Sequence, residues 1–274
     1  MATAPKPTTA KKESSGSSIF ASLTMVLCIV IGVLLWKFVM GNPANFEGNN
    51  PEGHPLPGNY FAMVYKGGFI VPILIGMLLM VIVFSIERFL VISKAAGTGN
   101  VESFVKRIQG LLSSGNIEAA VAECDKQKGS VANVIKSGLK KYREVEADPN
   151  LDIEQASLAI QKDIEEATAL EMPMLEQNLT IIATLVSVGT LTGLLGTVTG
   201  MIKSFAALAT AGAPDQAALA NGISEALINT ATGIATSTVA IIMYNIFTSK
   251  IDKLTYSIDE AGFSIVQTYA STHK

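Results

Sequence analysis

The chain has 274 residues, of which 49% are hydrophobic and 16% charged, and its mean hydropathy is +0.40. The apolar residues gather in four windows, so the composition excludes an ordinary soluble domain and indicates an integral membrane protein. The formal net charge of −3 argues against a surface for nucleic acid, and two histidines with two distant cysteines offer no metal-ligand spacing. We therefore expect no metal, no cofactor, no disulfide and no enzymatic activity.

The N-terminal part combines a polar tail with an apolar run. Residues 1–18 are rich in Thr, Ser, Pro and Lys and predict a disordered tail. Residues 19–40 are apolar over a length that can cross a bilayer. A cleaved signal peptide is the alternative, because basic residues precede the run. The run is longer than the usual hydrophobic region of a signal peptide and no clean cleavage site follows it, so we favour a retained span.

A loop and a second span come next. Residues 41–66 are dense in Gly, Asn and Pro and predict an irregular loop. Residues 67–92 predict a second span. Glu87 and Arg88 lie where this helix should leave the membrane, and we interpret them as an interfacial pair whose side chains reach toward the headgroups.

Residues 93–177 are polar and carry apolar residues at helical spacing, which predicts a helical domain outside the membrane. The sequence ADPN at 147–150 breaks this pattern, and Asn150 is a candidate N-cap for the next helix. From Leu151 the helical pattern continues into the third span with only Pro173 as a candidate kink. An unbroken helix to Ala209 would be about 90 Å long.

The remaining segments are a third span at 178–211, a short turn at 212–216, a fourth span at 217–248 and an amphipathic C-terminal helix at 249–274. Lys and Arg lie mainly before the first span and after the second and fourth. The positive-inside rule then places both termini and the 93–177 domain in the cytoplasm, with the 41–66 loop and the 212–216 turn on the outer side. The fold class is thus an all-α membrane protein with four spans.

The fourth span has a polar face. Glu225, Asn229, Thr232 and Thr236 follow i, i+4, i+7, i+11 spacing and share one side of a helix. A carboxylate inside a membrane span costs several kcal/mol unless it is paired, protonated or wetted, so Glu225 is a candidate functional residue. This side is too polar for lipid, and we expect it to face a pore or another polypeptide.

The third span is rich in Gly and Thr, and two interpretations stay open for each of its threonines. Small and hydroxyl residues allow two helices to pack closely, and Gly193, Gly196 and Gly200, with Gly233 of the fourth span, fit that role. The alternative is a proton pathway. Thr197 and Thr230 lie at nearly equal distances from the turn, so antiparallel spans should place them at one depth, with Glu225 farther out.

Three motifs in these spans carry a resemblance. They are GLLGTVTGMIKSF (Gly193–Phe205), GISEALINTATG (Gly222–Gly233) and MYN (Met243–Asn245). With them, residues 67–250 resemble the MotA/TolQ/ExbB proton-channel family, in particular ExbB and TolQ. Members of this type have three spans, so residues 19–40 look like an added one.

The resemblance implies a pentamer in the bacterial inner membrane around an ExbD-like or TolR-like partner, whose single membrane helix bears an aspartate. Carried over by motif, Thr197 and Thr230 match the family's pore threonines and Glu225 its glutamate in the last span. Asn229, Thr232 and Thr236 are further pore-lining candidates. The implied function is to convert proton-motive force into mechanical work on a TonB-type transducer or a Tol–Pal-type system. A flagellar or gliding-type stator subunit and a structural membrane scaffold are the alternatives.

Overall fold

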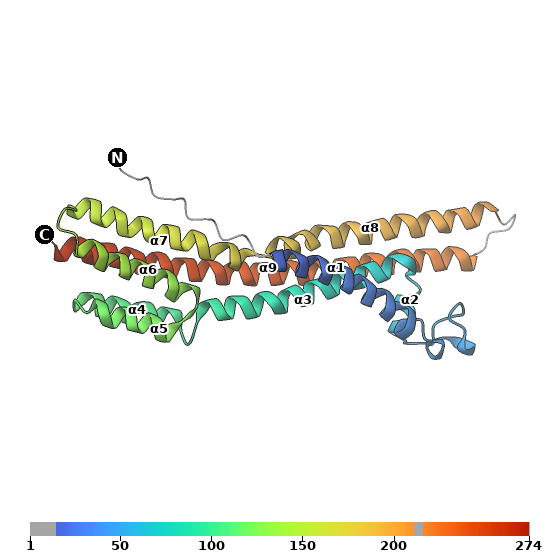
Figure 1. Ribbon diagram of the computed structural model, residues 1–274. Coiled ribbons are helices and arrows are strands. Elements are labelled where there is room, and N and C mark those ends of the chain that lie inside the picture. Colours follow the sequence, from blue (N-terminus) through green and yellow to red (C-terminus); the bar gives the residue numbers. More distant parts are fainter. Residues whose placement is uncertain (1–14, 211–215, 274) are drawn as a thin grey trace. The chain divides into compact units, whose positions relative to one another are not determined.

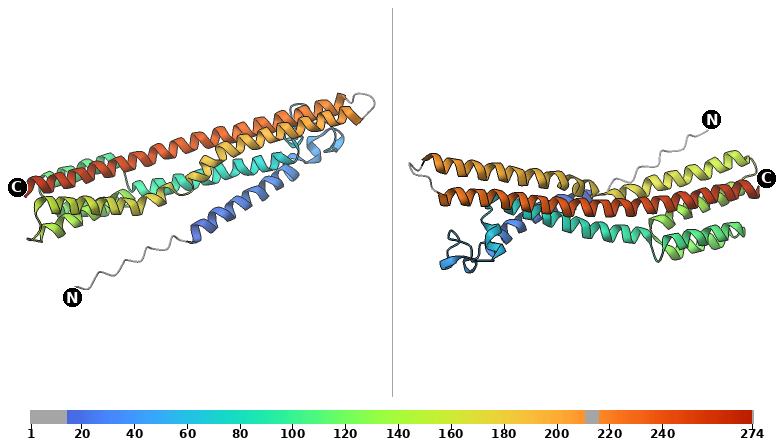
Figure 2. Two further views of the ribbon diagram at one scale, coloured as in Figure 1. Left: turned by 90° about the horizontal axis from the view of Figure 1, so that it is seen from above. Right: turned by 180° about the vertical axis from the view of Figure 1, so that it is seen from behind.

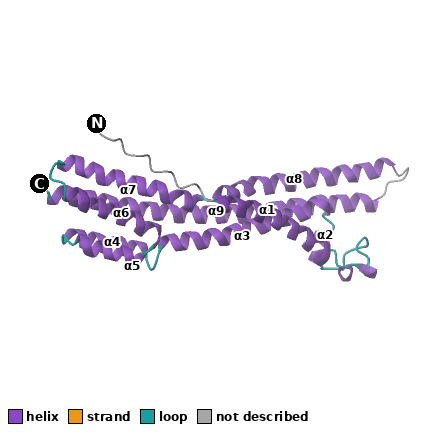
Figure 3. Ribbon diagram, viewed as in Figure 1, coloured by secondary structure: helices purple, strands orange, loops and turns teal. Residues whose placement is uncertain are grey.

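The computed structural model describes residues 15–210 and 216–273, and these are almost entirely helical (Figures 1 and 3). Residues 1–14 of the expected tail and residues 212–215 of the expected turn lie outside them. Within the described residues the only extended pairing is an isolated bridge between Phe46 and Pro55. Four helical segments there are long and apolar enough to cross a membrane. The predicted all-α membrane fold with four candidate spans is therefore confirmed.

The chain divides into two compact units. The first unit holds Met1–Val81 and Ser187–Ser237, and the second holds Ile82–Val186 and Thr238–Lys274.

In the first unit, the N-terminal helix α1 (Ser15–Leu34) starts before the expected residue 19 and continues as a π-helical segment, η1 (Leu35–Met40). It packs closely on the start of α3 (Val71–Ala96). A Cβ added to Gly32 would lie 2.8 Å from the backbone nitrogen of Gly76. Because Gly32 and Gly76 have no side chains, the backbones of α1 and α3 can approach closely where the two helices cross.

The segment expected as an irregular loop contains short helices and an aromatic cluster. The helices are η2 (Pro43–Asn45), η3 (Glu47–Asn49), α2 (Tyr60–Tyr65) and η4 (Gly68–Ile70). The Tyr65 ring stacks on Trp36 at 4.7 Å between centroids and meets the edge of Phe46 at 5.5 Å. The Trp36 indole also donates to the Tyr65 carbonyl. Contacts among three aromatic rings, of which Phe46 is buried, order a segment whose composition favours turns.

The first unit also contains parts of α8 (Leu179–Thr210) and α9 (Gln216–Thr272), which lie side by side there (Figures 1 and 2). Their contacting faces are lined by glycine. A Cβ added to Gly233 would lie 2.8 Å from the Cα of Gly193, and one added to Gly200 would lie 2.9 Å from the carbonyl oxygen of Gly222. Contacts this short leave no room for larger residues, so the glycines set the distance between the two helices.

The second unit is a helical domain built from α4 (Val101–Ser113), α5 (Ile117–Gln127), α6 (Gly129–Glu146) and α7 (Ile153–Glu176), with parts of α3, α8 and α9. The apolar stripes of these helices form its core, which includes Phe104, Ile108, Leu112, Ile135, Leu139 and Ile160. The N-cap of α7 is Asp152, whose side chain accepts from the Gln155 amide at 2.7 Å. The expectation of Asn150 at that position is wrong by two residues.

The expected unbroken helix from Leu151 to Ala209 is also wrong. The break is not at Pro173, which lies inside α7, but at Asn178, which adopts a left-handed φ of 62° between α7 and α8. Asparagine tolerates this conformation better than most residues.

The interpretation of Arg88 as an interfacial side chain that reaches toward the headgroups is corrected as well. Its side chain is 1% exposed, and its guanidinium donates to the carbonyls of Met174 and Leu175 at 3.0 and 3.1 Å. Glu87 pairs with the same guanidinium, with 2.6 Å between Nε and Oε2, and accepts from Asn178 at 3.4 Å. Arg88 therefore satisfies carbonyls that the end of α7 leaves unpaired.

Candidate functional site

The candidate site in the first unit is built around two threonine hydroxyls. Thr197 of α8 and Thr230 of α9 are hydrogen-bonded to each other through their Oγ1 atoms, and both side chains are half-buried. The Thr230 hydroxyl also lies 3.2 Å from the Ala226 carbonyl, one turn back in its own helix. The prediction that these two threonines lie at one depth is confirmed by this contact.

Asn229 lies beside the threonine pair and is completely buried in the unit. Its Nδ2 donates to the carbonyl of Gly67 at 2.9 Å. It occupies space that Gly196 leaves open, since a Cβ added to Gly196 would lie 2.8 Å from that same Nδ2. The Asn229 Oδ1 is buried without a hydrogen-bond partner among the described residues. Asn229 thus joins α9 to the turn that precedes α3.

Glu225 lies nearer the start of α9 than Thr230 does, and it is paired. Its Oε1 is 2.5 Å from the Nζ of Lys203, and the side chains are 15% and 52% exposed respectively. The Lys203 ammonium also lies 5.8 Å from the centre of the Phe69 ring. Gly68, with a φ of 78°, packs directly against the Glu225 carboxylate, where a Cβ would clash. An ion pair is one way to lower the cost of a carboxylate at membrane depth.

The other two predicted pore residues differ in their surroundings. Thr232 is half-buried and Thr236 is fully buried, and each hydroxyl donates to the carbonyl four residues earlier, at 2.8 and 2.9 Å. Their hydroxyls thus satisfy their own helix. Of the predicted residues, the structure joins Thr197 to Thr230 directly and connects Asn229 and Glu225 to the turn at residues 67–69.

Two features of this site escaped the sequence reasoning. Lys203 was not paired with Glu225 on the sequence alone. Its distance from the turn is similar to that of Glu225, which was the available signal for the pair. The contribution of Gly67, Gly68 and Phe69 had no such signal, because these residues lie far from the third and fourth spans in sequence.

This arrangement can solvate or relay a proton between hydroxyls, and it holds one carboxylate beside a cation. Threonine hydroxyls do not store a proton near neutral pH, so the pair needs a titrating group at its level to carry one. Among the described residues no cluster of three His, Cys, Asp or Glu side chains could hold a metal ion. Fold and site together define a multi-pass, all-α membrane protein with a polar site between two closely packed helices.

The model of the MotA/TolQ/ExbB proton channel family matches residues 126–260. The Tol-Pal system protein TolQ of Pseudomonas aeruginosa is 33% identical over 124 residues, which are 45% of this chain and 54% of that protein. A putative biopolymer transport protein, ExbB-like 3, of Synechocystis is 35% identical over 88 residues, 31% of this chain and 42% of that protein. The biopolymer transport protein ExbB of Salmonella typhimurium is 32% identical over 85 residues, 31% of this chain and 35% of that protein.

Residues 126–260 thus match the MotA/TolQ/ExbB proton channel family, and parts of the chain are similar to its ExbB and TolQ members. It matches about half or less of the length of each of these relatives.

Proposed function

We propose that this chain is the channel-forming subunit of an inner-membrane motor that converts proton-motive force into mechanical work. It acts as a homo-oligomer, a pentamer, around an ExbD-like partner whose membrane helix bears an aspartate. The motor energises TonB-dependent transport at the outer membrane. Both termini and the 93–177 domain lie in the cytoplasm in this proposal.

The observation that carries the proposal is the hydroxyl pair of Thr197 and Thr230. The glycine-lined contact of α8 with α9 holds the two side chains together at one depth. A partner carboxylate at this level would find hydroxyls ready to exchange hydrogen bonds as it gains or loses a proton. One elementary charge that moves through 100 mV yields about 2.3 kcal/mol, so a few transfers can bias a moving interface.

Glu225 has a different role in this proposal. Its carboxylate is held in an ion pair with Lys203, so we assign it to fixing the local structure rather than to carrying protons. Asn229, Thr232 and Thr236 remain candidates for the wall of the pathway in the assembled oligomer.

A second candidate is the TolQ-like subunit of a Tol–Pal system, because the similarity to a protein named TolQ extends over 124 residues. A flagellar or gliding-type stator would share the mechanism and act on another machine. Purification of the tagged chain from membranes, followed by identification of the transducer bound to it, distinguishes these candidates.

The test is the double substitution T197V/T230V, which keeps the side-chain volume and removes both hydroxyls. In cells that lack the native chain, we expect it to abolish transport driven by proton-motive force while the oligomer still assembles. T184V is the matched control, because Thr184 is an exposed threonine of α8 whose hydroxyl donates only to the Thr180 carbonyl. Intact transport in the double variant would refute the pore and favour the structural scaffold, in which these faces only pack.

A further inference from the structure

The second unit contains an apolar groove between α3 and α9 that the proposed function does not use. It has a volume of about 360 Å³ and is lined by Ile82, Ser85, Ile86, Phe89, Val239 and Met243. We call it the apolar groove. Ile86 and Phe89 are 58% and 51% exposed, so the groove is open. Ser85 points its hydroxyl into buried space without a hydrogen-bond partner among the described residues.

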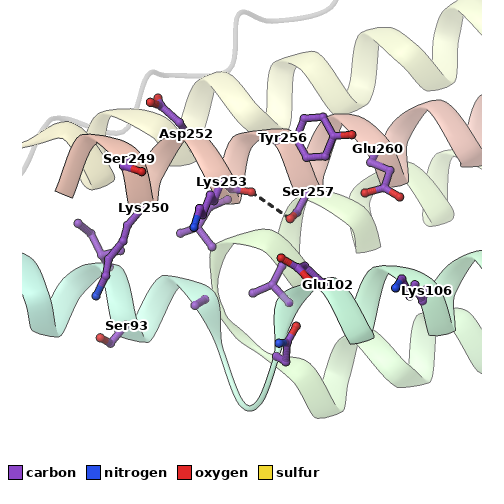
Figure 4. Close-up of a pocket in the computed structure, with 15 residues that line it drawn as sticks. Ser93, Glu102, Lys106, Ser249, Lys250, Asp252, Lys253, Tyr256, Ser257 and Glu260 are labelled. Carbon is purple, nitrogen blue, oxygen red and sulfur yellow. Dashed lines mark hydrogen bonds between the residues drawn. The ribbon is translucent and has the colours of Figure 1, made fainter. Parts of the chain in front are cut away.

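A second pocket follows one to two turns farther along the same two helices. It has a volume of about 740 Å³, and Ser93 of α3 and Ser249, Lys250 and Lys253 of α9 line its near end (Figure 4). We call it the lysine pocket. Figure 4 shows Lys250 and Lys253 extending from α9 toward α3, while Asp252 points away on the opposite side of α9.

The two pockets meet at Phe89. This residue lines the apolar groove, and the Lys250 ammonium lies 4.8 Å from the centre of its ring. Neither Lys250 nor Lys253 forms an ion pair with any described residue. Three acidic residues line the pocket: Glu102, Asp252 and Glu260. The Asp252 side chain points away from α3 (Figure 4), Glu102 and Glu260 lie farther along, and Glu260 is hydrogen-bonded to Gln109 at 3.1 Å. The surface therefore changes from wholly apolar to cationic within about two turns.

The order of an apolar surface followed by a cationic one matches the acyl chain and the anionic headgroup of a membrane lipid. At membrane depth an open apolar groove is filled by acyl chains, because lipid is the solvent there. Where the apolar part of a span ends, unpaired lysines attract anionic headgroups. A phosphate ester offers oxygens that accept from lysine ammonium and serine hydroxyl donors, which are the groups at the near end of the lysine pocket.

We propose that the α3–α9 groove binds an anionic glycerophospholipid, with an acyl chain in the apolar groove and its phosphate between Lys250 and Lys253. The site is independent of proton conduction and would hold even if the proposed function were wrong. A second copy of this chain seated in the groove is the competing occupant, and the experiment separates the two.

The experiment places the purified full-length chain in nanodiscs made of equal amounts of phosphatidylglycerol and phosphatidylcholine with identical acyl chains. The protein is then released into detergent, and retained lipids are counted by native mass spectrometry. We expect phosphatidylglycerol to be retained in preference to phosphatidylcholine. K250Q/K253Q should reduce that preference about thirtyfold, as expected for two lysines beside an anionic headgroup. K140Q/K162Q, which removes two exposed lysines elsewhere in the second unit, should leave it unchanged.

Two further variants test the apolar half and the competing occupant. I86W fills the apolar groove and should lower retention of both lipids. I86C, in a background without Cys28 and Cys124, should not form a disulfide with a second copy under oxidation. Equal retention of the two lipids by the native chain, or an unchanged preference in K250Q/K253Q, would overturn the proposal. An efficient I86C crosslink would show that protein covers the groove and would overturn it too.

Discussion

The Lys203 ammonium lies 2.5 Å from a carboxylate oxygen of Glu225 and joins α8 to α9 on the side of the threonine pair nearer the helix ends at Thr210 and Gln216. The same lysine lies over the ring of Phe69, in the turn before α3. Three segments that are separate in sequence therefore meet at one ion pair. Loss of either charge leaves the other without its partner at membrane depth, where solvation is poor.

The first prediction concerns this pair. K203Q and E225Q should each lower the unfolding midpoint of the purified chain in detergent, and K203Q/E225Q should lose less than the sum of the two. The coupling should be about 1 kcal/mol, because Lys203 is half-exposed. The exchanged pair K203E/E225K should recover part of the stability. Strict additivity of the single effects would show that the contact contributes nothing.

The second prediction concerns the space that Gly196 leaves for Asn229. G196A should destabilise the chain by about 1–3 kcal/mol, because its methyl group overlaps the buried amide side chain. G196A/N229A should remain destabilised, because alanine keeps the Cβ of residue 229, which lies 2.4 Å from the added methyl group. G110A is the control of opposite sign: nothing lies within 4 Å of the position, and alanine should stabilise α4 by about 0.5–1 kcal/mol. Thermal unfolding in detergent measures all three.

The third prediction concerns the end of α7. R88M should lower the free energy of unfolding by about 3–5 kcal/mol. It leaves Glu87 without its ion-pair partner and the Met174 and Leu175 carbonyls without their donor. R143M removes an exposed partner of Glu118 and should cost at most about 1 kcal/mol. Hydrogen exchange of the amides around Asn178 should rise in R88M only. Equal stability of the two variants would refute the buried cap.

The fourth prediction is a dependence on pH in the second unit. The hydrogen bond from Arg107 lowers the pKa of Glu123, and Lys126 adds to this effect. A lowered folded-state pKa stabilises the fold above the unfolded pKa, and this contribution is lost as the pH falls through the folded value. E123Q should therefore be less stable than the native chain at neutral pH, and the difference should vanish in acid. A difference that persists in acid would assign the effect to packing.

The fifth prediction concerns the thiol of Cys124. Burial raises its pKa to about 12, with a contribution from the neighbouring Asp125. Because the thiolate is the reactive form, Cys124 should resist alkylation at pH 8 in the folded chain and react once the second unit unfolds. Mass spectrometry of the alkylated chain measures this, with C124S to identify the site. Rapid labelling of the native chain would show that the helix opens readily.

The sequence by itself determined the helical class and the four candidate spans, because each apolar run is long enough to span the hydrocarbon core as a single helix. It also determined that Thr197 and Thr230 share one depth. Helical rise and the position of the turn fix that relation, and the hydroxyl contact confirms it. Such features depend on local periodicity, which the order of residues records directly.

Only the tertiary structure decided which polar groups meet. Arg88 is buried because it reaches carbonyls 86 and 87 residues away, and Asn229 points inward because it reaches Gly67, 162 residues away. At the break, Asn178 likewise donates to Glu87 of α3, 91 residues away, a contact that the sequence around Pro173 does not record. Helical periodicity shows on which face of a helix a residue lies. It does not show which other segment packs against that face, because long-range packing decides this.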